Sequence, residues 1–390
     1  MLIAALRVFL VVVTAFLVAF YVITSYFAFR KPKTRRYSDI NPLKVSVIIP
    51  AYNEEGVVES LLQNLRNSSF SIAETIVVDD HSIDSTYEVA KKMNATVIRN
   101  EAKLGKAASL NTGAKIAKED IIVVLDADNR PEKDCIKHLL KHFDSKDVAV
   151  VTGVTKIHSN GFVSRLTALE FSLCFNLFHP FSSRFDFFPI LHGAFFSMRR
   201  ELASFNEDAL TEDFDFSVDI ASKGYKIEFE PQAISYVSPP PSLSLFKRQR
   251  EKWTRGAVQA SLRHKGFSKR VFRHVGFIGL FLMALGYMLP LVWAATLTFI
   301  LICYVLSEPL LMNIAILATA IYTVVVFLAN SLAENNIGNV LALPVLGYFY
   351  LFFVIWYFIK AVILERRGVK AEFSKIPHVR PLADVREHPG

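Results

Sequence analysis

The sequence predicts an α/β fold in which a parallel sheet covered by helices lies between an N-terminal membrane helix and a C-terminal membrane region. Residues 44–240 alternate short β-branched runs with helical stretches, which is the pattern of a parallel sheet with crossover helices. Residues 1–30 and 275–364 are far more apolar than soluble domains of such length. The expected order is therefore anchor, sheet domain and membrane region.

The N-terminal segment, residues 1–30, is predicted to be a transmembrane helix. Residues 3–29 are almost free of charge, and at about 1.5 Å per residue they exceed the ~30 Å of bilayer hydrocarbon. The basic cluster at residues 30–36 follows the apolar run, whereas a signal peptide carries its charges before it. We therefore expect an uncleaved anchor, with a basic linker at residues 31–43 on the cytoplasmic side.

The sheet domain is expected to cover residues 44–240. Its strands are predicted from the runs VSVIIPAY, TIVVDD, ATVIRN, DIIVVLDAD and VAVVTG, which begin at Val45, Thr75, Ala95, Asp120 and Val148. Helical stretches separate them, and Pro131 is placed to open one of these helices. Ligands of open α/β sheets bind beyond the carboxyl ends of the strands. The polar residues that end these strands should form the site: Tyr52, Asn53, Glu54, Asp79, Asp80, Asp126 and Asp128.

Three prolines at residues 239–241 end the sheet domain, and residues 241–274 are predicted to form a basic amphipathic helix region. Residues 247–274 hold ten Lys or Arg against one acid, and Phe246 and Trp253 share a helical face. Beside a membrane, this cluster suits anionic lipid or a diphosphate better than nucleic acid, for which no recognition motif occurs. We expect an interfacial helix on the cytoplasmic leaflet. The alternative is a solvated helix packed on the sheet domain.

Residues 275–364 are predicted to form C-terminal transmembrane helices, in three blocks divided near residues 307–309 and 334–338. Three simple crossings would leave the C-terminus outside the cell. The tail, residues 365–390, carries six Lys or Arg, which favours the cytoplasm. The first block is too long for one upright helix, so it is expected to be re-entrant or partly interfacial. We expect a multi-pass protein of the cell membrane whose sheet domain and tail are cytoplasmic.

The cysteines indicate neither a disulfide framework nor a zinc site. Cys135, Cys174 and Cys303 form no close pair and no metal-ligand spacing. This agrees with a cytoplasmic sheet domain. The sequence points to membrane lipid as a partner, and to no nucleic acid or protein partner.

Two acidic motifs carry the predicted chemistry. Asp126 and Asp128 end a strongly apolar strand, and alternation along an extended chain points both carboxylates to the same side. Such hard oxygen ligands suit Mg²⁺ or Mn²⁺ held jointly with phosphate oxygens. A predicted helix starts at Thr211, Glu212 and Asp213. The structural alternative to a catalytic role is an N-cap followed by acids that interact favourably with the helix dipole. The structural alternative to metal binding by Asp126 and Asp128 is turn formation.

The ordered motifs VSVIIPAYNEE, VVDDHS, LGKAASLNTG, LDADN, HGAFFSMRR, LTEDFDFSVDIASKGY and QREKW carry a family resemblance. Together they resemble the family 2 inverting glycosyltransferases of the GT-A (Rossmann-like) fold, in their membrane-integrated, cellulose-synthase-like branch. The resemblance covers residues 44 to about 255. With so few membrane helices, the chain is similar to archaeal transmembrane mannosyltransferases of glycan assembly, such as N-glycan biosynthesis.

The resemblance implies a role for each matching position. Asp213 would be the general base, with Glu212 supporting it, and Asp128 would bind the metal ion, Mn²⁺ or Mg²⁺. The remaining matches would bind substrate: Pro50, Tyr52, Glu54, Asp79 and Asp80 the nucleoside, Lys106 and Asp126 the nucleotide or diphosphate, and Gln249, Arg250, Lys252 and Trp253 the acceptor end and diphosphate.

Two positions depart from the family pattern. Lys252 stands where the Q-x-x-R-W motif has arginine, and lysine lacks the bidentate fork, so diphosphate binding is expected to be weaker or shared with Arg250 or Arg255. His81 stands where glycine is common, and we interpret it as a loop side chain. His192 is predicted either to face the acceptor beside Gly193, which lets a substrate approach the backbone, or to be an ordinary buried histidine.

The resemblance implies transfer of a hexose, with inversion, from a nucleotide-sugar donor to a lipid-linked or membrane-proximal glycan. GDP-mannose is the first expected donor and a UDP-hexose the second. Two alternatives stay open: a processive polysaccharide synthase of the cellulose or hyaluronan type, and a non-catalytic nucleotide-sugar-binding membrane protein. A dinucleotide-binding oxidoreductase is disfavoured, because no G-x-G-x-x-G turn follows the first strand.

Overall fold

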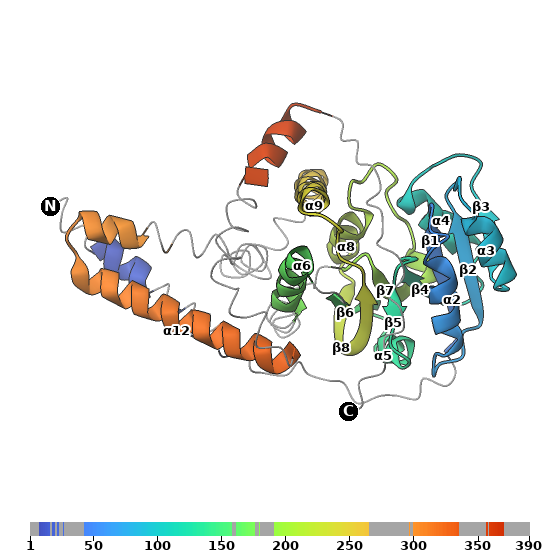
Figure 1. Cartoon of the computed structure of the whole chain (residues 1–390), viewed down its shortest axis with the longest axis horizontal. Coiled ribbons are helices and arrows are strands. Elements are labelled where there is room, and N and C mark those ends of the chain that lie inside the picture. Colours follow the sequence, from blue (N-terminus) through green and yellow to red (C-terminus); the bar gives the residue numbers. More distant parts are fainter. Residues whose placement is uncertain are drawn as a thin grey trace. The chain divides into compact units, whose positions relative to one another are not determined.

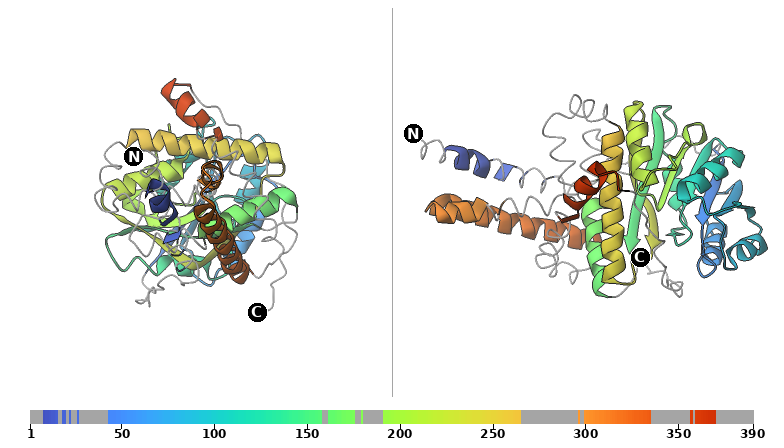
Figure 2. Two further views of the ribbon diagram at one scale, coloured as in Figure 1. Left: turned by 90° about the vertical axis from the view of Figure 1, so that its left-hand side faces the viewer. Right: turned by 90° about the horizontal axis from the view of Figure 1, so that it is seen from above.

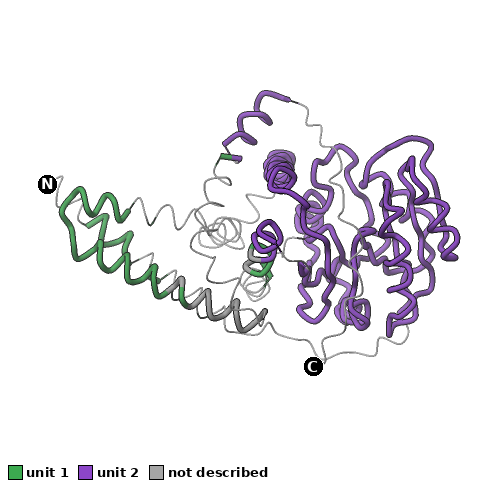
Figure 3. Tube along the Cα trace, in the orientation of Figure 1, with its two compact units in different colours: residues 1–33, 169–187, 274–356 green, residues 34–168, 188–273, 357–390 purple. Residues whose placement is uncertain are grey.

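The computed structural model forms two compact units, which are coloured separately in Figure 3. The first unit comprises residues 1–33, 169–187 and 274–356, and the second comprises residues 34–168, 188–273 and 357–390. Apart from a few single positions, the structure describes residues 8–15, 43–157, 161–175, 191–264, 299–334 and 359–369.

The second unit contains an eight-stranded sheet in the order β3-β2-β1-β4-β7-β6-β8-β5 (Figure 1). Strands β3, β2, β1 and β4 are parallel, β7 is antiparallel to β4 and β6, and β5 is antiparallel to β8. The strands are β1 (Val45–Ala51), β2 (Glu74–Asp79), β3 (Thr96–Arg99), β4 (Ile121–Leu125), β5 (Arg130–Pro131), β6 (Val148–Ile157), β7 (Phe195–Arg199) and β8 (Lys226–Val237). The predicted α/β fold is confirmed: the predicted parallel pairing holds for β1 to β4, and antiparallel strands make the whole sheet mixed.

Helices cover both faces of this sheet. Strand residues alternate between the two faces, so Val47 and Ile49 pack with α2, α3 and α5, whereas Ile48 packs with α4 and α8. Figure 2 gives two further views of this layering. The helices of the second unit are α2 (Val58–Arg66), α3 (Thr86–Lys92), α4 (Lys106–Ile116), α5 (Cys135–Leu140), α8 (Glu212–Ser222) and α9 (Leu243–Arg263). Helix α6 (Phe162–Leu173) begins in the second unit and ends in the first, and α12 (Pro309–Glu334) belongs to the first unit. Residues 359–366 are also helical.

Pro131 is a correction to the predicted helix start. It pairs with Ser235 in the short strand β5, and α5 begins four residues later at Cys135. A proline lacks the backbone N–H of the ladder and is tolerated in an edge strand. Strand β5 is at the edge of the sheet, so the position is compatible with proline.

The membrane prediction concerns residues that the structure describes only in part. Within the described ranges, none of the helices combines the length and the apolar character that a bilayer crossing demands. The predicted membrane segment 1–30, the linker 31–43 and the tail 365–390 lie largely outside those ranges, whereas the predicted segment 275–364 is described mainly at residues 299–334 and 359–364. The predicted amphipathic helix is confirmed as a helix in α9, which packs on α8, in agreement with the alternative of packing on the sheet domain.

Gly113 sets the close packing of α4 on β1. A Cβ atom at this position would lie 2.6 Å from Ile48 Cγ2, which is attached directly to the branched Cβ of a strand residue. Gly113→Ala should therefore lower the free energy of unfolding by about 1–3 kcal/mol, although alanine has the better helix propensity. Denaturant unfolding of the purified chain measures this difference.

Gly56→Ala is the matched control, because a Cβ at Gly56 meets no atom within 4 Å. Equal stability of the two variants would contradict the packing argument.

Candidate active site

Lys106, the first residue of α4, joins three segments of the site. Its Nζ lies 2.6 Å from Asp126 Oδ1 and 3.2 Å from Glu212 Oε1. It also donates a hydrogen bond of 2.9 Å to the carbonyl oxygen of Gly193. The pKa of Lys106 is raised because these carboxylates outweigh the opposing effect of burial. Residues that are up to about a hundred positions apart in the chain therefore meet at one ammonium group.

The Asp126 to Asp128 segment is fixed between two strands. The Asp126 N–H donates to the Ala194 carbonyl, and the Asn129 side-chain amide donates to the same oxygen at 2.7 Å. Ser235 of β8 donates to Asn129 Oδ1 at 2.7 Å. Burial raises the pKa of Asp126 to about 7; Asp128 adds to this rise, and Lys106 opposes it. The electrostatic effect of Asp128 on Asp126 agrees with the prediction of two neighbouring carboxylates.

Asp213, at the start of α8, is held by backbone amides. The Gly193 N–H donates to Asp213 Oδ2 at 2.9 Å, and the Phe214 N–H donates to Oδ1 at 2.8 Å. Burial, together with the neighbouring Glu212, raises the pKa of Asp213 to about 6. Burial acts to raise the pKa of Glu212 as well, but Lys106 and Lys252 lower it overall. The pKa values of these two adjacent acids are therefore shifted in opposite directions. Asp213 has a pKa suited to a general base near neutral pH.

Gly193 and His192 precede β7 and lie beside this pair. A Cβ on Gly193 would approach Asp213 Oδ2 to 2.4 Å, so glycine is required there for the carboxylate itself. The predicted passage of substrate over Gly193 stays a prediction. Burial and the charge of Arg250 lower the pKa of His192 to about 4, so its ring is neutral at physiological pH.

The polar residues after β2 organise the loop before α4. Asp80 accepts hydrogen bonds from the backbone N–H groups of Leu104 and Gly105 and from the Asn100 amide, all at 2.8 Å. Gly105 has φ +96°, which favours glycine. Asp79 is fully buried, with Arg99 3.2 Å away. Asp79 thus has a role inside the fold. Its buried side chain gives no support to the predicted contact with the sugar donor.

The residues that follow β1 form the neighbouring part of the edge. Lys103 Nζ lies 4.1 Å from the centre of the Tyr52 ring, a cation–π geometry. The Glu54 N–H donates to Thr86 Oγ1 at 2.7 Å, and the Glu54 side chain is buried. Pro50 lies within β1 opposite Val78. The predicted contacts of these residues with a nucleoside stay predictions.

His81 has the loop role that we expected. Its φ of 62° lies in the left-handed region that favours glycine, and its Nδ1 lies 3.3 Å from the Asn100 carbonyl oxygen. Asn100 and Asn129 are site residues that the sequence analysis missed. Asn100 directly follows β3 and Asn129 directly follows Asp128, so the rule of polar residues at strand ends would have found both.

The α9 residues of the Q-x-x-R-W motif form a compact group. The Arg250 guanidinium lies 4.4 Å from the Trp253 ring centre and 3.9 Å from that of Phe246. Gln249 Oε1 accepts a hydrogen bond from Arg250. Lys252 acts electrostatically on Glu212, so this cation of α9 lies near the start of α8.

Arg255 is a correction to the suggested sharing of diphosphate binding. Its guanidinium is engaged by Glu365 at 2.7 Å and by the Val369 carbonyl at 2.7 Å, and its side chain is 6% exposed. Because Glu365 already compensates this guanidinium, the suggestion that Arg255 shares diphosphate binding is not supported. The same suggestion for Arg250, which is equally buried, stays a prediction.

The residues present fit a divalent cation only if the substrate completes its coordination. Across the described ranges, no three His, Cys, Asp or Glu side chains converge as a metal-binding group. Asp126 and Asp128 supply carboxylate oxygens, and Lys106 already contacts one of them. Mg²⁺ and Mn²⁺ accept such an arrangement, because phosphate oxygens and water can supply the remaining ligands.

The mixed sheet with acids at its edge has the GT-A fold. Residues 46–205 match the model of glycosyl transferase family 2. The mannosyltransferase PcManGT from Pyrobaculum calidifontis, solved in complex with GDP-Man and Mn²⁺, shares the fold with a TM-score of 0.59 at 20% identity, over 94% of this chain and 99% of that one.

Two curated relatives are also glycosyltransferases by name. A probable glycosyltransferase of Bacillus subtilis (strain 168), YdaM, is 34% identical over 233 residues, 55% of this chain and 55% of the relative. A poly-β-1,6-N-acetyl-D-glucosamine synthase of Staphylococcus aureus (strain MSSA476) is 24% identical over 230 residues, 56% of each chain. The chain spans about half the length of these relatives.

Gly193→Ala should sharply lower sugar transfer, because the added methyl group would displace the Asp213 carboxylate that Gly193 now binds. A misplacement of about 1 Å can reduce turnover on the order of 10²-fold. Initial rates of product formation measure the loss, with Gly56→Ala as the control. Wild-type turnover of Gly193→Ala, with a folded protein, would show that the close approach has no catalytic importance.

Proposed function

We propose that this chain transfers a hexose, with inversion, from a nucleotide sugar to an acceptor hydroxyl on a lipid-linked or membrane-proximal glycan. The observation that carries the proposal is the Asp213 carboxylate. It is bound to the Gly193 amide and lies next to Glu212, which contacts the Lys106 and Asp126 pair. A base with a raised pKa therefore stands beside a group of charges suited to a diphosphate.

In this mechanism Asp213 accepts the proton of the acceptor hydroxyl as that oxygen attacks the anomeric carbon. Glu212 stays ionised, because Lys106 and Lys252 lower its pKa. Lys252, whose charge acts on Glu212, stabilises the nucleoside diphosphate as it leaves. Arg250, whose charge acts on His192 beside Gly193, is the second cation proposed for this role. A divalent cation held by Asp126 and Asp128 would neutralise part of the diphosphate charge.

GDP-mannose is the first donor we propose, with Mn²⁺ or Mg²⁺ as cofactor. It is supported by the resemblance to mannosyltransferases and by the shared fold of the Pyrobaculum calidifontis enzyme. A UDP-hexose such as UDP-N-acetylglucosamine is second, supported by the Staphylococcus aureus relative. We also propose a location at the cell membrane with the GT-A domain cytoplasmic, supported by the apolar composition of residues 1–30 and 275–364.

The name of the Staphylococcus aureus relative favours a second candidate function, a processive polysaccharide synthase. Lys252 in place of the motif arginine argues for single addition, because lysine holds a diphosphate with less geometric definition. Incubation with radiolabelled GDP-mannose or UDP-N-acetylglucosamine and a polyprenyl phosphate distinguishes the two by product length. A ladder of long products would support the processive synthase.

Asp213→Asn should lower kcat by about 10²–10⁴-fold, because the amide cannot accept the acceptor proton. Binding of GDP-mannose with Mn²⁺, measured by thermal shift, should stay near the wild-type value, since Asp213 is not proposed to contact the nucleotide. Asp219→Asn on the same helix is the control. Near-normal turnover of Asp213→Asn would remove the proposed base.

The pH dependence of kcat should show one group that must be ionised. Because the pKa of Asp213 is raised to about 6, kcat should be constant above this value and fall about tenfold per pH unit below it. The rate must be measured at saturating donor, because Asp126, with a pKa of about 7, acts on donor binding. A flat profile between pH 5 and pH 8, measured as about constant kcat, would contradict Asp213 as the base.

A further inference from the structure

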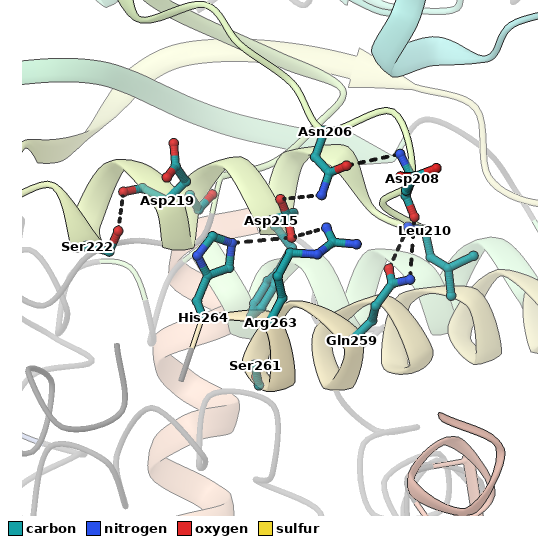
Figure 4. A network of polar contacts seen from close by, with 12 residues as sticks. Asn206, Asp208, Leu210, Asp215, Asp219, Ser222, Gln259, Ser261, Arg263 and His264 are labelled. Atoms are coloured by element: carbon teal, nitrogen blue, oxygen red, sulfur yellow. Dashed lines mark hydrogen bonds and ion pairs between the residues drawn. The ribbon is translucent and has the colours of Figure 1, made fainter. Parts of the chain in front are cut away.

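A polar network fixes the C-terminal part of α9 to α8 and centres on Asp215 (Figure 4). Arg263 Nη1 lies 2.8 Å from Asp215 Oδ1, and His264 Nε2 lies 3.4 Å from the same oxygen. The Asn206 amide donates to Asp215 Oδ2 at 3.4 Å. The Asp215 side chain is only 6% exposed. A nearly buried carboxylate on α8 is thus compensated by groups that lie mainly on α9.

The contact between the two segments continues along α9 towards its N-terminus. Gln259 accepts a hydrogen bond from the Leu210 N–H at 3.0 Å and donates to the Asp208 carbonyl at 3.4 Å. At Gly256, an added Cβ would lie 2.1 Å from Thr211 Oγ1, so the backbone of α9 directly touches the residue before Glu212. The interface therefore runs along residues 208–215 and leaves little room for the two segments to slide.

The residues of this interface share one stripe of α9 with two residues of the acceptor motif. At 3.6 residues per turn, spacings of three and four keep side chains on the same side of a helix. Such spacings connect Gln249, Lys252, Gly256, Gln259 and Arg263. The C-terminal half of the stripe packs on the start of α8, and its N-terminal half carries Gln249 and Lys252. The electrostatic effect of Lys252 on Glu212 agrees with this placement.

Asp215 itself points away from the proposed chemistry. Asp213, two residues earlier on α8, binds the Gly193 amide, and positions two apart on a helix are separated by about 200°. Asp215 instead faces Arg263 and His264. The contacts of Asp215 with Arg263 and His264 therefore link it to α9 and not to the Asp213 carboxylate.

We propose that Asp215 is a positioning residue: its ion pair with Arg263 holds α9 in the register that presents Gln249 and Lys252 to Glu212 and Asp213. The catalytic consequence rests on the proposed function, whereas the structural consequence does not. Weakening this ion pair loosens the C-terminal end of the stripe, and the N-terminal end then shifts relative to the base. Transfer is sensitive to such shifts, because a displacement of about 1 Å can cost on the order of 10²-fold in rate.

The test compares Asp215→Asn with Asp219→Asn. Asp219 is on the same helix, but it pairs with Lys223 of its own helix at 2.6 Å and is 27% exposed, so its loss leaves the contact with α9 intact. Asp215→Asn should lower kcat for transfer from GDP-mannose or UDP-N-acetylglucosamine by at least about tenfold, with donor affinity within about twofold of wild type. Hydrogen exchange of the amides in residues 249–256 should become faster in this variant and not in Asp219→Asn.

A double-mutant cycle separates positioning from general destabilisation. Arg263→Gln should reproduce the loss seen in Asp215→Asn, the double variant should lose little more, and Arg263→Lys should retain most of the activity. Arg263→Gln also carries the test if Asp215→Asn does not fold. Wild-type kcat and wild-type exchange at residues 249–256 in both single variants would overturn the proposal.

The two proposals fail in different ways. If the wild-type protein transfers neither sugar, the proposed function is contradicted, and exchange at residues 249–256 alone decides the role of Asp215. If the wild-type protein is active and Asp215→Asn matches Asp219→Asn in kcat and in exchange, the positioning role is wrong and the proposed function stands.

Discussion

The arrangement of the site depends on one ammonium group, that of Lys106. It contacts Asp126 at the end of β4, Glu212 at the start of α8 and the carbonyl of Gly193 before β7. The negative groups of these three segments would repel one another in the interior. Without a cation, their burial would cost free energy, because an uncompensated buried charge is unfavourable. The cation at the start of α4 removes this repulsion, so the edge of the sheet can hold several acids at once.

Gly193 connects Lys106 to the proposed base, Asp213. Its carbonyl accepts from Lys106 and its N–H donates to Asp213, so a single peptide segment links the cation to the carboxylate. The absence of a side chain is a steric requirement, since a Cβ would overlap Asp213 Oδ2. Lys106 and Gly193 together thus determine both where Asp213 lies and how its neighbour Glu212 is charged.

The sequence predicted the strands with strong apolar runs and the acids that follow them, because burial on both faces leaves a continuous β-branched pattern. It missed β7 and β8, and with them the antiparallel pairings. In β7, Ser197 and Arg199 interrupt the apolar run, and β8 contains charged positions such as Glu228 and Glu230 that break an apolar pattern. The ion pairs of Asp79 with Arg99 and of Arg255 with Glu365 were missed for a related reason. They depend on tertiary contacts, which local spacing does not encode.

The charges of the site favour the proposed cation. Among the described residues, the carboxylates of Asp126, Glu212 and Asp213 act on the ammonium group of Lys106. Asp128 acts on Asp126, and Lys252 acts on Glu212. A diphosphate would meet an excess of negative charge there, even though the raised pKa values of Asp126 and Asp213 reduce it. A divalent ion shared between the carboxylates and the phosphate oxygens would reverse this repulsion. Lys252 of α9 acts on Glu212 in the same group of charges, which is why the position of α9 relative to α8 is expected to control transfer.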